Sequence, residues 1–356
     1  MTRLRTLVVL TCLALTAGTS GSALAEERTS FKIAWSIYVG WMPWAYADEM
    51  GIVDKWAQKY GIEIEVTQIN DYIESINQYT AGGYDGCVMT NMDALTIPAA
   101  GGVDSTALIL GDFSNGNDGI VSKNGIDIWG LKGETINLVE LSVSHYLLAR
   151  ALDDAGLTER DVTLINTSDA DMVAAFTGSD EVTTVVTWNP LLSEIEAQPG
   201  ASKIFDSSQI PGEIIDMMVV NTEVLEANPN FGKALVGAWY ETMGLMLGDS
   251  TTAIEARTYM AEQSGTDLAG YDSQLATTKM FFDAAEAVEF AKSPALKATM
   301  DHVRNFSHTH GLLGDGAASV DAIGMTFPGD EMLGDSGNVK LRFNVDYMEM
   351  AARGAL

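Results

Sequence analysis

The amino-acid sequence predicts an α/β protein of two lobes, each a mainly parallel sheet covered by helices, with a ligand cleft between the lobes. Strand-like and helix-like segments alternate through the first two thirds of the 356 residues, which is typical of parallel sheets. Two turn-rich breaks, at 115–119 and 209–213, bracket a second alternating run. Two such crossings predict one lobe made of 26–117 and 214–356 and a second lobe made of 118–213.

The first alternating run begins with a short strand and a helix that proline starts. Pro43 suits the first helical turn, because the N–H that it lacks would be unpaired there. Residues 62–69 alternate between apolar and polar side chains, as a strand does. In chain order we expect strands over 31–35, 62–69, 84–89 and 106–110, and helices over 44–50, 72–81 and 93–100.

The second alternating run has the same character. Gly156 ends one of its helices, and Asn189-Pro190 combines a good N-cap residue with proline at the first helical position. We expect strands over 135–139, 162–165 and 183–186, and helices over 144–155 and 170–176. After the return crossing we expect a strand over 217–220, then mostly helices from Asn230 to a terminal helix over 346–352.

The N-terminal segment 1–25 has the composition of a secretory signal peptide. Arg3 and Arg5 form a basic start, and an apolar run from 7 to 15 follows that is too short for a membrane anchor. Ala23-Leu24-Ala25 fits the small-residue cleavage rule. The sequence therefore predicts cleavage after Ala25 and export of the mature chain from the cytoplasm.

Charge and cysteine content narrow the function classes. The sequence has 20 Lys and Arg residues against 49 Asp and Glu residues, for a net charge of −29. This balance argues against nucleic acid and anionic membrane surfaces as partners. Cleavage would leave Cys87 as the single cysteine, which excludes an intramolecular disulfide. We expect Cys87 to be an inert residue of a buried strand.

Aromatic residues crowd the loop that follows the first strand. Trp35, Tyr38 and Trp41 lie where this strand gives way to a helix. Ligands of open α/β sheets bind at the carboxyl ends of strands, beside helix N-termini. We therefore predict that these rings form walls of a ligand site, with a role as core anchors as the alternative for each ring.

Polar or aromatic residues also follow the ends of other expected strands, and they would face the same cleft. These candidate ligand-binding residues are Asn91, Asp93, Glu140, Ser142, Trp188 and Asp216. Structural alternatives exist: Asp93 would complement a helix dipole and Ser142 would cap a helix. Glu140 is harder to explain structurally, because an acid at the buried end of an apolar strand must find a partner.

Motifs for catalysis and for cofactors are missing from the sequence. There is no phosphate loop, no nucleophile elbow and no zinc-protease motif. His308 and His310 are read as part of a solvated turn, because no further metal ligand lies nearby in sequence. The segment 112–118 is only faintly like a calcium loop and is read as a hinge. We therefore expect no cofactor, no metal and no enzymatic activity.

Four landmarks give the chain a resemblance to a known family. The segments 38–53, 78–86, 131–133 and 188–190 resemble motifs of the solute-binding proteins that serve ABC importers of nitrate, sulfonates, taurine and thiamine-precursor pyrimidines. This resemblance implies the two-lobed fold of type II periplasmic binding proteins and a periplasmic location. It also implies a small-molecule ligand, a membrane permease as partner and a monomeric chain.

Three further segments are similar to the binding proteins found with urea carboxylase systems. They are 34–44, 70–80 and 139–150. This similarity implies a small nitrogen-rich solute, urea or guanidine. Physical chemistry favours guanidinium, a planar cation with donors only, because the candidate site offers aromatic faces and carboxylates. The alternatives are another small solute such as a sulfonate or a pyrimidine, a sensory role, or an enzyme on the same fold.

Overall fold

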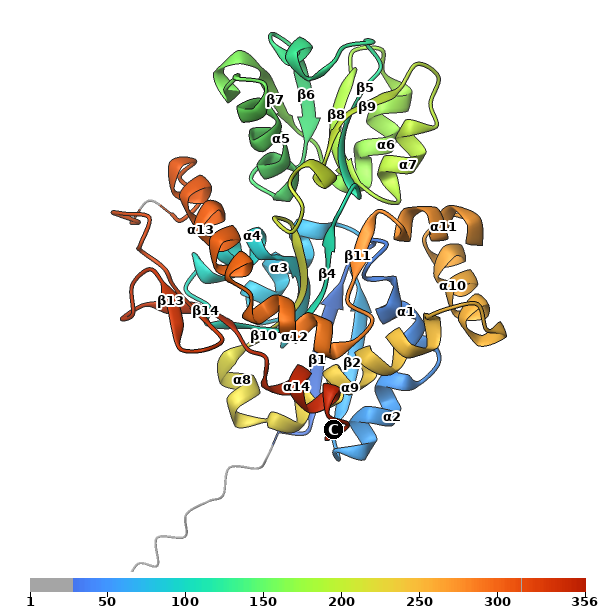
Figure 1. The fold of residues 1–356 in the computed structure, drawn as a ribbon, viewed down its shortest axis with the longest axis vertical. Coiled ribbons are helices and arrows are strands. Elements are labelled where there is room, and N and C mark those ends of the chain that lie inside the picture. Colours follow the sequence, from blue (N-terminus) through green and yellow to red (C-terminus); the bar gives the residue numbers. More distant parts are fainter. Residues whose placement is uncertain (1–27, 315) are drawn as a thin grey trace, which may run out of the picture.

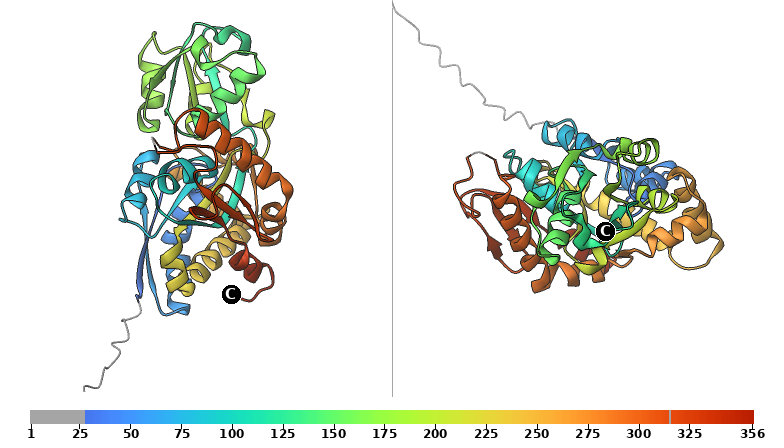
Figure 2. Two further views of the ribbon diagram at one scale, coloured as in Figure 1. Left: turned by 90° about the vertical axis from the view of Figure 1, so that its left-hand side faces the viewer. Right: turned by 90° about the horizontal axis from the view of Figure 1, so that it is seen from above.

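The computed structural model describes residues 28–314 and 316–356, so the predicted signal peptide lies outside the described residues. The described chain forms two α/β lobes, each a sheet covered by helices, as the sequence predicts. In Figure 1 and in the left view of Figure 2, the lobe built from the middle of the chain stands above the other. We call the lower one lobe 1 and the upper one lobe 2.

The described strands of lobe 1 form one sheet in the order β13-β12-β14-β4-β10-β3-β1-β2, and β11 pairs with β4 beside this path. The strands are β1 (Ser30–Trp35), β2 (Glu63–Gln68), β3 (Gly86–Thr90), β4 (Ser105–Ser114), β10 (Ile215–Asn221), β11 (Thr278–Met280), β12 (Gly324–Phe327), β13 (Glu331–Leu333) and β14 (Val339–Phe343). The described strands of lobe 2 have the order β7-β6-β8-β5-β9. They are β5 (Asp118–Ser122), β6 (Thr135–Leu138), β7 (Thr163–Asn166), β8 (Thr184–Trp188) and β9 (Ser202–Asp206).

Helices cover both sheets (Figure 1). Those of lobe 1 are α1 (Met42–Glu49), α2 (Ile52–Lys59), α3 (Tyr72–Thr80), α4 (Asn91–Ala94), α8 (Thr222–Ala227), α9 (Pro229–Met246), α10 (Thr251–Gln263), α11 (Leu268–Leu275), α12 (Ala284–Lys292), α13 (Pro294–Thr309) and α14 (Asp346–Ala352). Those of lobe 2 are α5 (Val143–Asp154), α6 (Asp169–Gly178) and α7 (Leu191–Glu196), with the 3₁₀ turns η2 (Ile128–Leu131), η3 (Glu159–Asp161) and η4 (Ser207–Gln209). No helix of the described residues is both long enough and apolar enough to span a bilayer.

Each sheet has a parallel part and an antiparallel strand where the chain changes lobe. β1 runs parallel to β2 and β3, whereas β10 runs antiparallel to both β3 and β4. In lobe 2, β5 runs antiparallel to β8 and β9. The chain leaves lobe 1 through β4 and returns through β10, so these two neighbouring strands must run in opposite directions.

Two local expectations differ from the structure in ways that matter for the site. In the segment 112–118, expected as a hinge loop, only the bend at 115–117 is irregular, because 112–114 complete β4 and Asp118 begins β5. This difference arises because β4 and β10 pair along nearly their whole length, which carries regular structure up to the lobe boundary. Asp216 lies beside the return crossing, as expected, and is the second residue of the buried strand β10. Pro190 occupies the N-cap of α7 after a cis peptide bond, not the first helical position.

Aromatic side chains anchor the core of lobe 1 beneath the lobe boundary. Phe31 stacks on Phe231 with ring centroids 4.6 Å apart, and Trp44 packs on Trp239 at 5.2 Å. Cys87 is fully buried in β3, in agreement with the expected structural role. This packing holds β1, β3 and α1 in place, and the residues that follow these strands reach the boundary between the lobes.

Candidate functional site

A small pocket lies between the two lobes, and its cavity volume of about 10 Å³ is close to the space of one water molecule. Lobe 1 and the crossing segments contribute most of its lining, and Asp118, Val143 and Trp188 come from lobe 2. The lining residues are Tyr38, Trp41, Tyr72, Thr90, Asp118, Val143, Trp188, Ile214 and Asp216. Two grooves are larger, with volumes of about 590 and 390 Å³, and neither is lined by a comparable set of buried acids and rings.

Four aromatic rings form a continuous arc around this cavity. Tyr38 packs edge-on against Trp41 at 4.9 Å between ring centroids, and Trp41 contacts Tyr72 at 5.6 Å. Tyr72 in turn meets Trp188 of lobe 2 at 5.6 Å, edge to face. The arc therefore draws on both lobes, and a ligand held against it would contact both.

Four buried carboxyl groups gather at the same place. Asp93, Asp112, Asp118 and Asp216 are each at most 3 % exposed. Asp118 and Asp216 line the cavity directly. Within the described residues, none of the four forms an ion pair with a lysine, arginine or histidine. A cluster of buried acids without a cation is costly, because each ionised carboxylate has lost its hydration.

Tyrosine and threonine hydroxyls orient two of these acids. The Tyr38 hydroxyl donates to Asp112 Oδ1 at 2.9 Å. The Tyr72 hydroxyl and Thr90 Oγ1 both donate to Asp93 Oδ2, at 2.6 and 2.9 Å. The opposite oxygens, Asp93 Oδ1 and Asp112 Oδ2, have no hydrogen-bond partner among the described residues, and the same holds for Asp216 Oδ2. A donor from a ligand can satisfy these oxygens, and for Asp112 and Asp216 a proton shared between the two acids can do so as well.

Burial raises the pKa of all four acids. The pKa of Asp93 rises to about 6, and the pKa values of Asp112 and Asp118 rise to about 7. Desolvation, followed by the charges of Asp112 and Asp118, raises the pKa of Asp216 well above its ordinary value. Asp112 and Asp216 face each other across the β4–β10 pairing, so one proton can be shared between them in the empty protein.

Gly40 is required by the close approach of the aromatic loop to Asp112. A Cβ atom at position 40 would lie 2.5 Å from Asp112 Oδ2 and 2.5 Å from the ring of Tyr38. We expect Gly40→Ala to displace one of these side chains and to lower the free energy of unfolding by roughly 1–3 kcal/mol, as overpacking does. Chemical denaturation measures this effect.

The control for this variant is Gly244→Ala within α9. A Cβ atom there meets nothing within 4 Å. Alanine should stabilise the helix by up to about 1 kcal/mol, because it is the better helix former. Equal stability of Gly40→Ala and the native protein would show that the loop tolerates a side chain at position 40.

The structure brings five of the sequence-predicted site residues together. Tyr38, Trp41, Trp188 and Asp216 line the cavity, and Asp93 lies directly behind it through its bonds to Tyr72 and Thr90. These residues come from the segments that follow β1 and β3, from α4, from the end of β8 and from β10. They converge because these segments all reach the boundary between the two sheets, where the cavity lies.

Four other candidates lie outside the lining of the cavity. Trp35 is buried at the end of β1, paired in register with β2. The Asn91 amide donates to the Glu213 carbonyl at 3.1 Å and so fixes the return crossing. Ser142 caps α5, since its hydroxyl accepts from the Ser144 N–H at 3.2 Å.

Glu140 is the fourth of these candidates. β6 ends at Leu138, two residues before Glu140, and the following turn at Leu141 has a positive φ of 63°. Glu140 is therefore only half-buried, and its backbone N–H donates to Asn166 Oδ1 at 3.0 Å. The premise that this acid is buried at a strand end was wrong, so it needs no buried partner.

Sequence reasoning missed Asp112, Asp118 and Tyr72. The two acids fell within a segment interpreted as a hinge loop, because asparagine and glycine separate them. The available signal was their position beside apolar runs, 107–110 before Asp112 and 120–121 after Asp118. Tyr72 was read only as the start of a helix, and nothing local indicates that its hydroxyl reaches Asp93.

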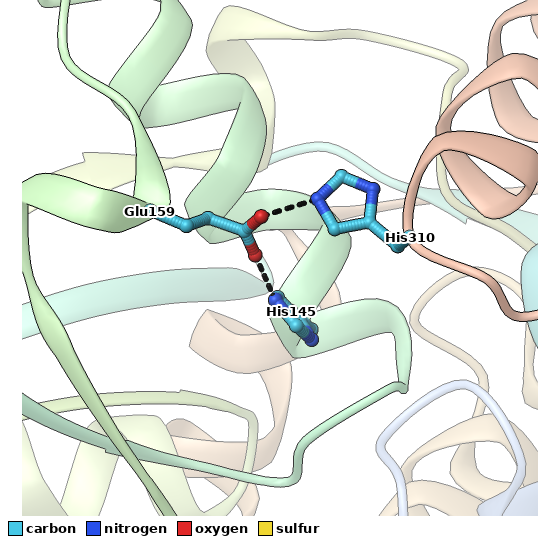
Figure 3. A group of neighbouring side chains, drawn as sticks. All are labelled: His145, Glu159 and His310. Carbon is cyan, nitrogen blue, oxygen red and sulfur yellow. Dashed lines mark hydrogen bonds and ion pairs between the residues drawn. The ribbon is translucent and has the colours of Figure 1, made fainter.

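A second cluster of titratable residues, outside the lining of this cavity, lies where α5 and η3 of lobe 2 meet the end of α13 (Figure 3). His145, Glu159 and His310 bring three potential ligand atoms within 4.8 Å of one another. However, His145 Nδ1 accepts a hydrogen bond from the Leu141 N–H at 3.1 Å, so the proton of the neutral ring is on Nε2. Nε2 therefore has no lone pair for a metal ion. The contact between His145 and Glu159 is better explained as a hydrogen bond than as two ligands of one metal ion.

Comparisons with known proteins agree with this architecture. A sequence model of the NMT1-like family matches residues 24–261. The structure is similar to the alkanesulfonate-binding protein SsuA from Xanthomonas axonopodis pv. citri bound to MOPS, with a TM-score of 0.66, 18% identity, and coverage of 82% of this chain and 96% of that chain.

Two further solved structures show the same fold. The aliphatic sulphonate binding protein SsuA from Escherichia coli has a TM-score of 0.66 and 17% identity, and the match covers 81% of this chain and 94% of that one. The nitrate-binding protein NrtA from Synechocystis PCC 6803 has a TM-score of 0.64 and 14% identity, with coverage of 92% and 89%. No curated protein matches the sequence.

Proposed function

Because the chain belongs to the NMT1-like family, we propose that it is the periplasmic solute-binding component of an ABC importer and that its ligand is a small organic cation, with guanidinium ahead of urea. The binding role is supported by the fold shared with sulfonate- and nitrate-binding proteins. The proposal that the ligand is a cation rests on the residues that line the cavity of this chain. The proposed partners are therefore a small cation and a membrane permease, with no reaction catalysed.

The observation that carries this proposal is the set of four buried carboxyl groups without a cation. A nitrate or sulfonate ligand would have to enter beside Asp118 and Asp216, which line the cavity together with neutral aromatic and aliphatic side chains. An anion would require these acids to stay protonated, because an ionised carboxylate beside it would repel it strongly at low dielectric. A cation instead supplies the missing charge, and the ring faces of Trp41 and Trp188 favour it further.

The balance of donors and acceptors favours guanidinium over urea. Three carboxyl oxygens in and behind the cavity lack a donor, whereas Trp41 Nε1 is the one ring N–H of the lining that lacks an acceptor among the described residues. Guanidinium has donors only and pairs with carboxylates. Urea also needs donors for its carbonyl oxygen, which this arrangement supplies poorly.

A thermal-shift screen of the purified protein tests the ligand class. We expect guanidinium chloride at low millimolar concentration to raise the melting temperature, because a ligand at 100 times its Kd adds about 2.7 kcal/mol to stability. Urea should act more weakly, and nitrate and taurine should have no specific effect. Sodium chloride at equal ionic strength is the control. Stabilisation by taurine or nitrate without stabilisation by guanidinium would contradict the proposed cation site.

A further inference from the structure

The cluster of His145, Glu159 and His310 connects the two lobes and lies outside the lining of the cavity. His145 lies on α5 and Glu159 in η3, both of lobe 2, whereas His310 caps α13 of lobe 1. Figure 3 shows that the Glu159 carboxylate points between the two rings. One of its oxygens contacts His145 Nε2 and the other contacts His310 Nε2.

Hydrogen-bond partners assign the protons on both rings. His145 accepts from a backbone N–H at Nδ1, so it is neutral and donates to Glu159 from Nε2. His310 Nδ1 lies 2.8 Å from the Phe306 carbonyl oxygen, which can only accept, and its Nε2 faces the other Glu159 oxygen. Both nitrogens of His310 must therefore donate, which makes this ring an imidazolium.

The surroundings of His310 favour this charge. The hydrogen bond to Glu159 raises the pKa of His310 above 6.5, with the charges of Glu159 and Asp153 adding to the effect. The two histidine contacts lower the pKa of Glu159 to about 2 despite its partial burial. Arg150 of α5 forms an ion pair with Glu213, to which its guanidinium donates two hydrogen bonds of 2.8 and 3.0 Å. His302 of α13 also lines the groove beside the cluster.

An apolar contact accompanies the charged one. Phe306 stacks on the His310 ring at 4.0 Å between centroids and meets Tyr146 of α5 edge-on at 5.1 Å. The Phe306–Tyr146 contact joins the lobes, and neither of its rings changes charge in the range where histidine titrates. Packing therefore stabilises the interface between the lobes at any pH, and the Glu159–His310 ion pair adds a stabilisation that depends on pH.

We propose that Glu159 and the protonated ring of His310 form a latch between the lobes, which favours their closed arrangement and weakens when His310 loses its proton. The latch would regulate access to the ligand cavity, and in that respect it rests on the proposed function. The direction of the pH effect on closure follows from linkage. A group whose pKa is higher in the closed form than in the open form stabilises the closed form at low pH. The stabilisation is lost as the pH rises through the raised value of His310.

The test measures closure directly and without ligand. Spin labels at Trp129→Cys in lobe 2 and Leu247→Cys in lobe 1 report the distance between the lobes, since both positions are exposed. Cys87 is fully buried and should not react with the label. Between about pH 5 and about pH 8.5 we expect the closed-to-open ratio to fall about tenfold for each unit by which closure raises the pKa of His310.

Variants assign the pH response to the latch. His310→Gln and Glu159→Gln should each flatten the response in this range, whereas His308→Gln, two residues from His310, should retain it. In nuclear magnetic resonance spectra, the His310 ring should titrate above 6.5 in the native protein and lower in Glu159→Gln. A closed fraction that does not change with pH, or a response that survives in His310→Gln, would overturn the proposal.

Metal binding is the competing outcome. Stoichiometric binding of zinc that increases closure and disappears in His145→Gln would replace the proton latch by a metal site. Failure of the latch is distinguishable from failure of the proposed ligand. The distance measurement contains no guanidinium, and the thermal-shift screen at a fixed pH does not depend on His310.

Discussion

Replacing Asp216 by Asn is expected to weaken guanidinium binding about a hundredfold or more while making the empty protein more stable. Asp216 lines the cavity, is 2 % exposed and has an oxygen without a partner. A buried cation that loses its carboxylate loses about 3–5 kcal/mol, and about 1.4 kcal/mol corresponds to tenfold in affinity. The same carboxylate destabilises the empty fold because its desolvation is uncompensated, and a neutral amide removes that cost.

Asp118→Asn should show the same pair of opposite effects. Asp118 also lines the cavity, from the other lobe, and no ion pair compensates it among the described residues. Calorimetry gives the affinity, and thermal unfolding without ligand gives the stability. A residue that only holds the fold together would lose stability on substitution, so the opposite signs identify a ligand-binding role.

The matched control is Glu140→Gln, the same change of acid to amide at a half-buried position outside the lining of the cavity. We expect its guanidinium affinity to stay within about twofold of the native value, since Glu140 does not line the cavity and solvent and salt screen a charge that water reaches. Unchanged affinity in Asp216→Asn and Asp118→Asn alike would refute the cation site. Equal losses in Glu140→Gln would show that the net charge of the chain, not the cavity, attracts the ligand.

Acid conditions should weaken guanidinium binding and stabilise the empty protein. The pKa of Asp93 is about 6, and the pKa values of Asp112 and Asp118 are about 7, because burial disfavours their charged forms. Protons therefore compete with the cation below about pH 7, and the affinity should fall up to about tenfold per pH unit for each proton displaced. An anion-binding site would show the opposite trend.

The stability of the empty protein follows from the same pKa values. An acid whose pKa is higher in the folded state than in the unfolded chain binds more protons when folded. The free energy of unfolding should therefore rise as the pH falls from about 7 towards about 4, by up to about 1.4 kcal/mol per pH unit for each such group. Calorimetric titrations and unfolding curves over this range measure both trends. An affinity for guanidinium that does not change with pH would place the ligand away from these acids.

The architecture follows largely from patterns that are local in sequence. Alternating strand and helix signals in two runs identified the fold class, because a strand followed by a helix returns to the same sheet. The position of Tyr38 and Trp41 after the first strand predicted that they would line the candidate site, since ligands bind at strand ends. Asp93 and Trp188 follow from the same reasoning.

Only the tertiary structure decided which acids gather at the candidate site and how the lobes meet. Asp112 joined the cluster of buried acids because β4 pairs with β10 up to the lobe boundary, and Glu140 did not because β6 ends two residues before it. The Glu159–His310 contact joins residues 151 positions apart, so no local pattern predicts it. Periodicity determines which segments become strands, whereas pairing with distant strands determines where each strand ends and which side chains it buries.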